Sequence, residues 1–331
     1  MRSRPFCALL ALLGGLLALS ACTGPPPRPP AVDQAALTGA LDMALTPDGT
    51  RAYIVWRGGV VSAMDVATSE QLWSVPVGAT PSDVAVTPDG RVLVSTWADE
   101  LVTVDPVARA VTARTPIPRQ PDEGDAVSAP GSLEMVVTPD GSRAVLARGD
   151  AGVTTVDLRT MAATSSRPGT GEISDVVLLP DGTQLFSQYM RNVVIAVDPA
   201  TGNQAWYAQV ADARELVVSP DGGTAYVVSP RYGTIWVVDL ATRQYTREIQ
   251  PGLDADDVAI DATGRRLAVS DPGGRVVVVD AATGAPQQDA LVDRMPSGLA
   301  FTPDGRRLVV VSAGAGVGSG TRSIELRGTG P

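Results

Sequence analysis

A four-residue turn recurs seven times along the chain and limits what the chain can fold into. Its first copy is Thr46-Pro47-Asp48-Gly49, and successive proline positions are 41, 51, 41, 40, 42 and 41 residues apart. The later copies occupy residues 87–90, 138–141, 179–182, 219–222, 261–264 and 302–305. A repeat of about 41 residues is typical of arrays in which each unit is one small sheet that packs against the next.

A second marker keeps the same spacing. An acidic residue follows each turn, at Asp65, Asp105, Asp157, Asp198, Asp239, Asp280 and Glu325. Because two independent markers share one period, the sequence indicates seven equivalent units rather than a chance recurrence.

The second unit shows how each unit is expected to fold. Residues 83–87, 91–97, 101–105 and 110–115 are valine-rich runs with apolar and polar residues alternating, which indicates four strands. The Pro-Asp-Gly turn supplies the fixed φ and the glycine that a tight hairpin needs. We therefore predict an all-β, seven-bladed β-propeller with four antiparallel strands in each blade.

The two ends of the repeat array raise the question of ring closure. Only six residues follow Glu325, too few for a fourth strand in the last unit, whereas residues 32–40 precede the first unit and are unassigned. We predict that residues 32–40 pair as the outer strand of the seventh blade and remove its exposed edge. The propeller would then form one domain, residues 32–331.

The N-terminus carries an export signal. Arg2 and Arg4 precede an apolar stretch that ends in Leu19-Ser20-Ala21-Cys22. This leader resembles those of bacterial lipoproteins, which implies that residues 1–21 are removed and that Cys22 is lipidated. A secretory peptide cleaved near Ala21, leaving a free Cys22, is the alternative.

The mature chain is expected to be tethered to the bacterial cell envelope. The proline-rich residues 22–31 favour extended polyproline geometry and would form a tether to the outer face of the cytoplasmic membrane or to the outer membrane. Cys7 lies in the leader, so the mature chain has no pair of cysteines for a disulfide. Apart from the lipid, we expect no membrane contact.

Composition excludes several functions. The chain has no histidine, every basic residue is arginine, and the formal net charge is −10. Imidazole bases, histidine metal ligands and Schiff-base lysines are therefore absent, and an acidic chain repels nucleic acid. We therefore expect a protein that does not bind nucleic acid. The composition favours a binding function over an enzymatic one.

Two resemblances refine the fold prediction. The string from Ser82 to Ser95, with its Ser-Asp-Val-Ala-Val-Thr-Pro-Asp-Gly core, resembles the YVTN family of seven-bladed propellers. Two units end at Trp73 and Trp206 in a manner similar to the tryptophan-docking blades of pyrroloquinoline quinone proteins. Such repeat motifs are specific for fold and weak for function.

A column of carboxylates provides the first candidate site. Five residues before each turn proline, at the entry of the innermost strand, stand Asp42, Asp83, Glu134, Asp175, Glu215 and Asp257, and only Gly298 breaks the column. These side chains would surround the channel mouth on the rim opposite the Pro-Asp-Gly turns. There they could hold a divalent cation or receive positively charged peptide groups.

The same column also has a structural interpretation. Each acid could accept backbone N–H bonds from the neighbouring blade or pair with arginines of the rim loops. The arginines concerned are Arg57, Arg148, Arg191, Arg214, Arg231 and Arg275. No cofactor is expected other than the possible cation.

An insertion provides the second candidate site. The spacing between Asp105 and the next turn is enlarged by residues 116–132, which contain Asp122, Glu123 and Asp125. A long polar loop in a regular array is often functional, although a tolerated surface insertion explains it equally well.

We therefore predict a monomeric, lipid-anchored binding or scaffold module. Its partner would be a protein, a peptide or a small molecule held on the rim opposite the turns. One alternative is a propeller enzyme, similar to lactonases, lyases or quinoproteins, that uses the channel carboxylates and a metal ion. Another is an envelope-assembly factor similar to the propeller lipoprotein of outer-membrane barrel insertion, although that family has eight blades.

Overall fold

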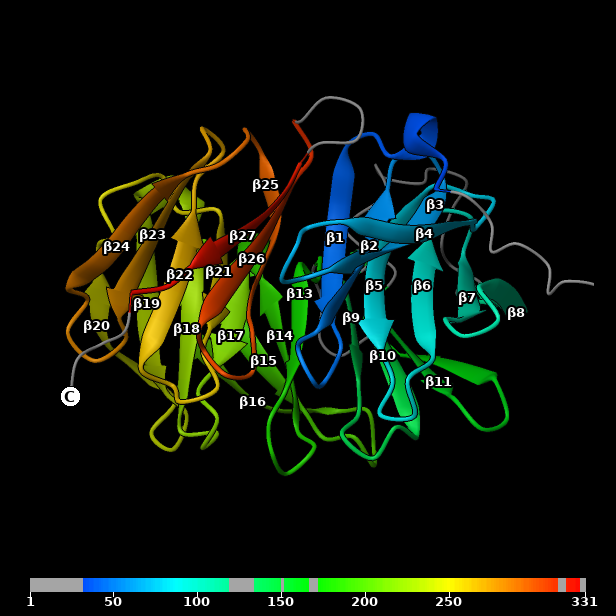
Figure 1. Ribbon diagram of the computed structural model, residues 1–331. Coiled ribbons are helices and arrows are strands. Elements are labelled where there is room, and N and C mark those ends of the chain that lie inside the picture. The colour runs from blue at the N-terminus through cyan, green and yellow to red at the C-terminus, as the bar shows by residue number, and fades with distance from the viewer. Residues whose placement is uncertain (1–31, 119–133, 150–151, 167–171, 315–319, 328–331) are drawn as a thin grey trace, which may run out of the picture.

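The computed structural model describes residues 32–118, 134–149, 152–166, 172–314 and 320–327. They form a ring of seven antiparallel sheets, seen from the side in Figure 1. Strands are consecutive within each sheet, and the described residues contain no helix longer than a 3₁₀ turn. The prediction of an all-β, seven-bladed propeller is confirmed.

Each blade is one run of consecutive strands, with the first strand of the run innermost. Blades one to three contain β1 (Ala40–Leu45), β2 (Arg51–Trp56), β3 (Val60–Asp65), β4 (Gln71–Pro76), β5 (Pro81–Val86), β6 (Val92–Thr96), β7 (Glu100–Asp105), β8 (Ala110–Pro116), β9 (Glu134–Val137), β10 (Arg143–Ala147), β11 (Val153–Asp157) and β12 (Ala162–Ser166). Blades four and five contain β13 (Asp175–Leu178), β14 (Gln184–Gln188), β15 (Val193–Val197), β16 (Gln204–Gln209), β17 (Leu216–Val218), β18 (Thr224–Ser229), β19 (Thr234–Asp239) and β20 (Gln244–Ile249). Blades six and seven contain β21 (Asp257–Ile260), β22 (Arg266–Ser270), β23 (Arg275–Asp280), β24 (Pro286–Leu291), β25 (Pro296–Phe301), β26 (Arg307–Ser312) and β27 (Thr321–Glu325). The 3₁₀ turns are η1 (Gln34–Ala36), η2 (Tyr189–Arg191) and η3 (Pro230–Tyr232).

The recurring turn is held by its own side chains. In the first copy the Thr46 hydroxyl donates to Asp48 Oδ1 at 2.5 Å and accepts the Arg51 N–H at 3.1 Å. Gly49 has a φ of 67° and donates its N–H to the Thr46 carbonyl at 2.8 Å. The same contacts recur in the turns at Thr138 and Thr302, so each motif closes its hairpin without help from the rest of the fold.

The turn also joins neighbouring blades. A Cβ on Gly222 would lie 2.7 Å from Cδ of Pro180, the turn proline of the preceding blade. Gly49 packs in the same way against Pro303 and links blade one to blade seven. Glycine is therefore required there for close packing as well as for positive φ.

The six aspartates of the second marker cap the turn between the third and fourth strands, whereas Glu325, the seventh member, pairs with Arg307. Asp65 Oδ1 accepts the N–H groups of Ala67 and Thr68 at 3.0 and 2.9 Å, and Asp157 and Asp280 cap their own turns in the same way. These are Asx turns, in which a short side chain imitates a backbone turn. Both markers are thus explained by local structure on one rim, the lower rim in Figure 1.

The ring closes by face-to-face packing of blade one on blade seven. Leu37, Ile54 and Trp56 form a buried cluster with Val309 and Val311 of β26. Across the same junction, the Ser297 hydroxyl donates to the Ala40 carbonyl at 2.7 Å.

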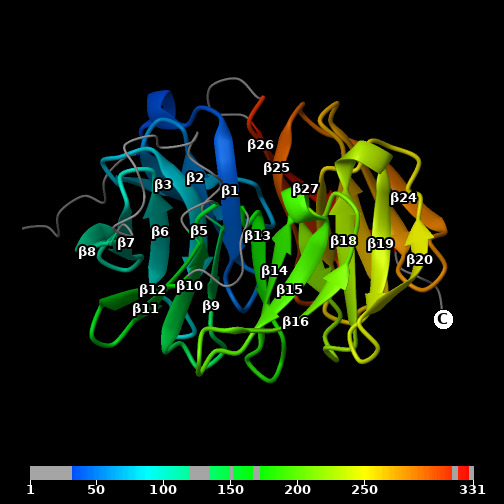
Figure 2. The same cartoon turned by 180° about the vertical axis from the view of Figure 1, so that it is seen from behind.

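The predicted closure by residues 32–40 is wrong. Blade seven has three strands among the described residues, β25, β26 and β27. The segment instead forms η1 on the rim opposite the turns (Figures 1 and 2), where the Asp33 N–H donates to the Ser74 hydroxyl of β4. The apolar side chains of the segment, Val32, Ala36 and Leu37, pack into the cluster between blades one and seven, so the segment covers that junction instead of forming an outer strand.

Several predictions fall outside the described residues. These are the leader 1–21, lipidation at Cys22, the tether 22–31, and the loop acids Asp122, Glu123 and Asp125. Within the part of the chain that the structure describes, no helix has the length and hydropathy required to cross a bilayer.

Candidate functional site

The predicted carboxylate column forms a ring around the propeller axis. The innermost strands contact one another in sequence from β1 to β25, and β25 contacts β1, so their first residues surround the propeller axis. Asp42, Asp83, Glu134, Asp175 and Asp257 lie on these strands, and Glu215 directly precedes β17. Gly298 completes the circle, and a Cβ there would lie 3.3 Å from Asp42 Oδ1.

Three aspartates link adjacent blades. Asp42 Oδ2 accepts the Val84 N–H at 3.2 Å, and Asp175 Oδ2 accepts the Leu216 N–H at 2.7 Å. Asp83 accepts the Met135 N–H in the same manner. Each bond runs from an inner strand to the next inner strand, so these carboxylates have an architectural role.

Burial raises the pKa of every acid in the ring. The pKa of Asp175 rises to about 6 and that of Asp257 to about 8, in both cases chiefly through loss of hydration. The pKa values of Glu134 and Glu215 lie well above the ordinary range because burial acts together with the negative charge of nearby acids. The pKa of Asp83 is raised by burial and then by Asp42, and burial also raises the pKa of Asp42 itself.

Two pairs of acids share hydrogen bonds. The side chain of Asp42 bonds to that of Asp83, and the side chain of Asp175 bonds to that of Glu215. A bond between two carboxyl groups requires a proton on one of them. The ring therefore retains several protons near neutral pH and attracts cations less than six carboxylates would. Among the described residues, no three acidic or thiol side chains are arranged to hold a metal ion.

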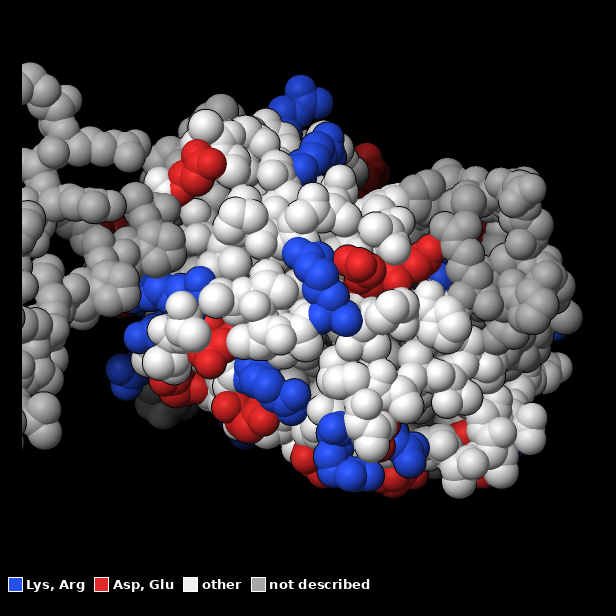
Figure 3. Space-filling view, turned by 90° about the vertical axis from the view of Figure 1, so that its right-hand side faces the viewer, with Lys and Arg blue, Asp and Glu red and all other residues white. Residues whose placement is uncertain are grey.

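The rim arginines do not neutralise this ring. Arg148, only 6% exposed, donates to Asp99 at 2.7 Å and to the Pro118 carbonyl at 3.1 Å. Arg275 pairs with Asp289 at 2.7 Å. Arg57, Arg191 and Arg231 are exposed. On the side shown in Figure 3, acidic and basic side chains are interspersed and no broad basic field appears.

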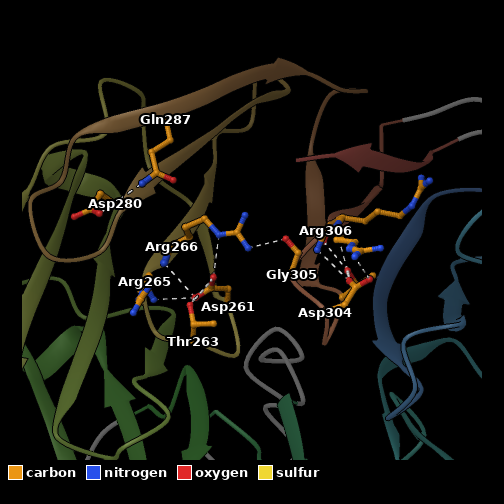
Figure 4. A network of polar contacts seen from close by, with 11 residues as sticks. Asp261, Thr263, Arg265, Arg266, Asp280, Gln287, Asp304, Gly305 and Arg306 are labelled. Carbon is orange, nitrogen blue, oxygen red and sulfur yellow. Dashed lines mark hydrogen bonds and ion pairs between the residues drawn. The ribbon is translucent and has the colours of Figure 1, made fainter. Parts of the chain in front are cut away.

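One arginine replaces a missing turn proline, as Figure 4 shows. Ala262 stands where other turns have proline, and Arg266 fills the space in front of Gly305. Arg266 donates from Nε to Asp261 at 2.9 Å and from Nη2 to the Gly305 carbonyl at 2.6 Å. Burial alone would raise the pKa of Asp261, but its hydrogen bonds, led by the one from Arg266, lower it overall. This network joins blades six and seven.

A second surface was not anticipated from the sequence. Eight of the 14 aromatic residues lie between residues 186 and 245, although the repeats elsewhere are poor in them. The aromatic–arginine surface, as we name it, lies at the junction of blades four and five. It consists of Tyr189, Trp206, Tyr232, Trp236 and Tyr245 with Arg214, Arg231 and Arg243. Only this uneven distribution of aromatic residues could have indicated it.

The rings of this surface contact one another. Trp236 packs edge-on against Tyr232 and Tyr245, with centroid separations of 6.5 and 5.3 Å. Its indole N–H donates to the Ala211 carbonyl at 3.1 Å, which fixes the ring. Tyr232 and Tyr245 are more than half exposed. An ordered aromatic surface of this kind is suited to a protein contact.

Arginines frame the rings. Arg214 lies 4.3 Å from the Tyr189 ring centroid, Arg243 lies 5.5 Å from that of Trp206, and Arg231 lies 5.8 Å from that of Tyr232. The backbone N–H of Arg231 donates to Asp212 Oδ2 at 2.8 Å, whereas the guanidinium groups of Arg231 and Arg243 form no ion pair within the described ranges. Tyr189 and Arg231 belong to η2 and η3, which follow second strands and so lie on the rim opposite the turns.

Comparison with known proteins identifies the family. Residues 34–208, and again residues 170–302, match the family described as outer membrane protein assembly factor BamB. The two matches overlap, as expected for a repetitive chain, and together span well over half of it. The chain belongs to this family. Its seven blades, which argued against a barrel-assembly relative, do not prevent the match, and the YVTN resemblance stays a prediction.

The other comparisons support the fold and give no further information about function. No curated protein matches the sequence. Among solved structures, a chain of Kuenenia stuttgartiensis hydrazine synthase has a TM-score of 0.74 and 18% identity. The similarity covers 87% of this chain and 96% of that chain. At such low identity a propeller that belongs to an enzyme does not make this BamB-family chain an enzyme.

Proposed function

We propose that this protein is a lipid-anchored scaffold of the bacterial cell envelope that binds a protein partner through the aromatic–arginine surface. Membership of the BamB family supports an extracytoplasmic role in outer-membrane protein assembly. The lipobox at Cys22 supports anchoring. The observation that carries the proposal is the cluster of contacting rings on blades four and five, in which Tyr232 and Tyr245 are exposed beside the partly buried Trp236.

Composition and geometry both favour a protein partner there. Aromatic and arginine side chains are the residues most enriched in energetically dominant interface contacts. Tyr232, Trp236 and Tyr245 already pack together, so little side-chain entropy is lost when a partner covers them. Arg231 and Arg243 would meet carboxylates of the partner, which gives the contact direction and specificity.

The test places a photoreactive amino acid at Tyr232 in cells. We expect one discrete crosslinked protein, identified by mass spectrometry as an outer-membrane protein or a component of its assembly. The matched control places the same group at Val107, which is 90% exposed in the β7–β8 turn of blade two. Arg231→Glu combined with Tyr245→Ser should lower the crosslink yield about tenfold or more, the effect of losing one dominant contact.

Two results would reject the proposal. One is equal crosslinking from Tyr232 and Val107, and the other is an undiminished yield in the double variant. The anchor is tested separately, because Cys22→Ser should release the protein from the membrane fraction. Its retention there would reject lipidation without affecting the surface.

A further inference from the structure

Among the described residues, blade seven has three strands and no outer strand, whereas the other six blades have four strands each. The third strand of a blade is shielded in those six, and β15, for example, is buried along its whole length. β27 occupies the same position in blade seven, and none of its five residues is buried. The side chains of Ile324 and Leu326 pack against the hydrophobic cluster between blades six and seven but are only partly buried. Within the described ranges, no strand pairs with the outer edge of β27, which lies on the outside of the ring in Figure 1.

The backbone of β27 presents hydrogen-bonding groups at this outer edge. The Leu326 N–H donates to the Arg306 carbonyl at 2.8 Å, and the Ser312 N–H donates to the Gly320 carbonyl at 2.7 Å. Even-numbered residues therefore bond to β26, whereas Thr321, Ser323 and Glu325 direct their peptide groups outward.

One side chain already uses this edge as a strand would. Gln288 of β24 donates from Nε2 to the Glu325 carbonyl at 3.1 Å and accepts the Arg327 N–H at 3.0 Å. The amide thus imitates a peptide group at one end of the edge. Across the rest of the described edge, the outward groups of Thr321 and Ser323 have no protein partner.

The charge beside the edge indicates the occupant. Arg306, Arg322 and Arg327 are exposed there, and Arg307 pairs with Glu325 at 3.3 Å. A second copy would bring this basic edge against itself. Residues 22–31 contain five prolines, which lack the N–H groups that strand pairing needs.

We propose that β27 binds an extended acidic segment of a partner protein, which pairs antiparallel with it as the fourth strand of blade seven. Main-chain bonds to Thr321, to Ser323 and to the Glu325 N–H would supply affinity, and Arg322 would select acidic side chains. This edge lies across the ring from blade four, as Figures 1 and 2 agree. It is therefore separate from the aromatic–arginine surface and does not depend on it.

The test measures binding of a labelled seven-residue peptide of alternating valine and glutamate to the full chain by fluorescence anisotropy. We expect a Kd of about 100 μM, since few backbone bonds form. Methylating alternate peptide nitrogens removes the donors on one edge and should weaken binding at least tenfold. A valine–lysine peptide should bind at least tenfold more weakly than the acidic one.

The matched protein variants are Ser323→Pro and Ser323→Ala. Proline removes one outward N–H and leaves the bonds to β26 intact, so binding should fall at least tenfold while the circular dichroism spectrum is unchanged. Alanine should retain binding. If Ser323→Pro alters the spectrum, Arg322→Glu takes its place and should weaken binding of the acidic peptide at least tenfold.

Several results would overturn the proposal. They are absence of binding by the acidic peptide, equal binding by its methylated form, and no effect of the substitutions. A dimer that Ser323→Pro dissociates would assign the edge to a second copy. Gain of peptide binding only after deletion of residues 22–31 would assign it to the tether.

Discussion

The acid ring should make the protein less stable as pH rises, and Asp257 allows a quantitative test. The pKa of Asp257 is about 8 in the folded chain and 3.8 in an unfolded one. At a pH between 3.8 and about 8, the Asp257 carboxyl group therefore holds a proton in the folded state that it has released in the unfolded state. The stability that Asp257 contributes is therefore complete below about pH 4 and is lost as pH rises towards 8.

The magnitude follows from the pKa difference. Each pH unit in this window removes about 1.4 kcal/mol from the free energy of unfolding, so the loss from pH 5 to pH 8 is about 4 kcal/mol. That is a large fraction of the 5–15 kcal/mol by which domains are usually stable. Asp257→Asn keeps an oxygen to accept the Val258 N–H, which lies at 2.6 Å in the native protein, and cannot ionise. The difference in the free energy of unfolding between the variant and the native protein should therefore grow by about 4 kcal/mol in favour of the variant from pH 5 to pH 8.

Urea unfolding at pH 5, 6, 7 and 8 measures this difference. The control is Asp140→Asn, because the pKa of Asp140 is lowered to about 2 by the Thr138 hydroxyl and the Ser142 N–H. Asp140 is ionised in both states across the range, so its variant should keep the native slope with pH. Identical slopes for the native protein and Asp257→Asn would refute the reasoning that burial keeps this acid protonated.

Two further predictions concern contacts between blades. Asp83→Ala leaves the Met135 N–H without its acceptor, whereas the Val84 N–H keeps its bond to Asp42, so the free energy of unfolding should fall by about 1–3 kcal/mol in urea titrations. A loss below about 0.5 kcal/mol would deny the bridge a structural role. Arg266→Gln should cost about 3 kcal/mol, because Asp261 would remain buried without its partner. The control Arg306→Gln changes a side chain that is 85% exposed and should cost less than about 0.5 kcal/mol, and an equal loss in both variants would contradict this explanation.

Much of the candidate site could be located from the sequence, but its chemistry could not. The spacing of the acids from the turn prolines placed Asp42, Asp83 and Asp175 on equivalent inner strands, and the structure brings them together there. Their raised pKa values depend on burial and on one another's charge, which no spacing reveals. The aromatic–arginine surface was missed because its residues come from two blades and follow no repeat.

The sequence by itself determined the blades. Turn residues such as Thr46 and Gly49, and capping residues such as Asp65, act through contacts within a few positions, so their recurrence specifies each hairpin and the number of units. Only the tertiary structure decided how the ring closes and which edge stays open. Leu37 is buried between blades one and seven, whereas β27 pairs with β26 and has no outer strand among the described residues. Those outcomes depend on surfaces from opposite ends of the chain, and a local pattern carries no information about which distant surface will cover it.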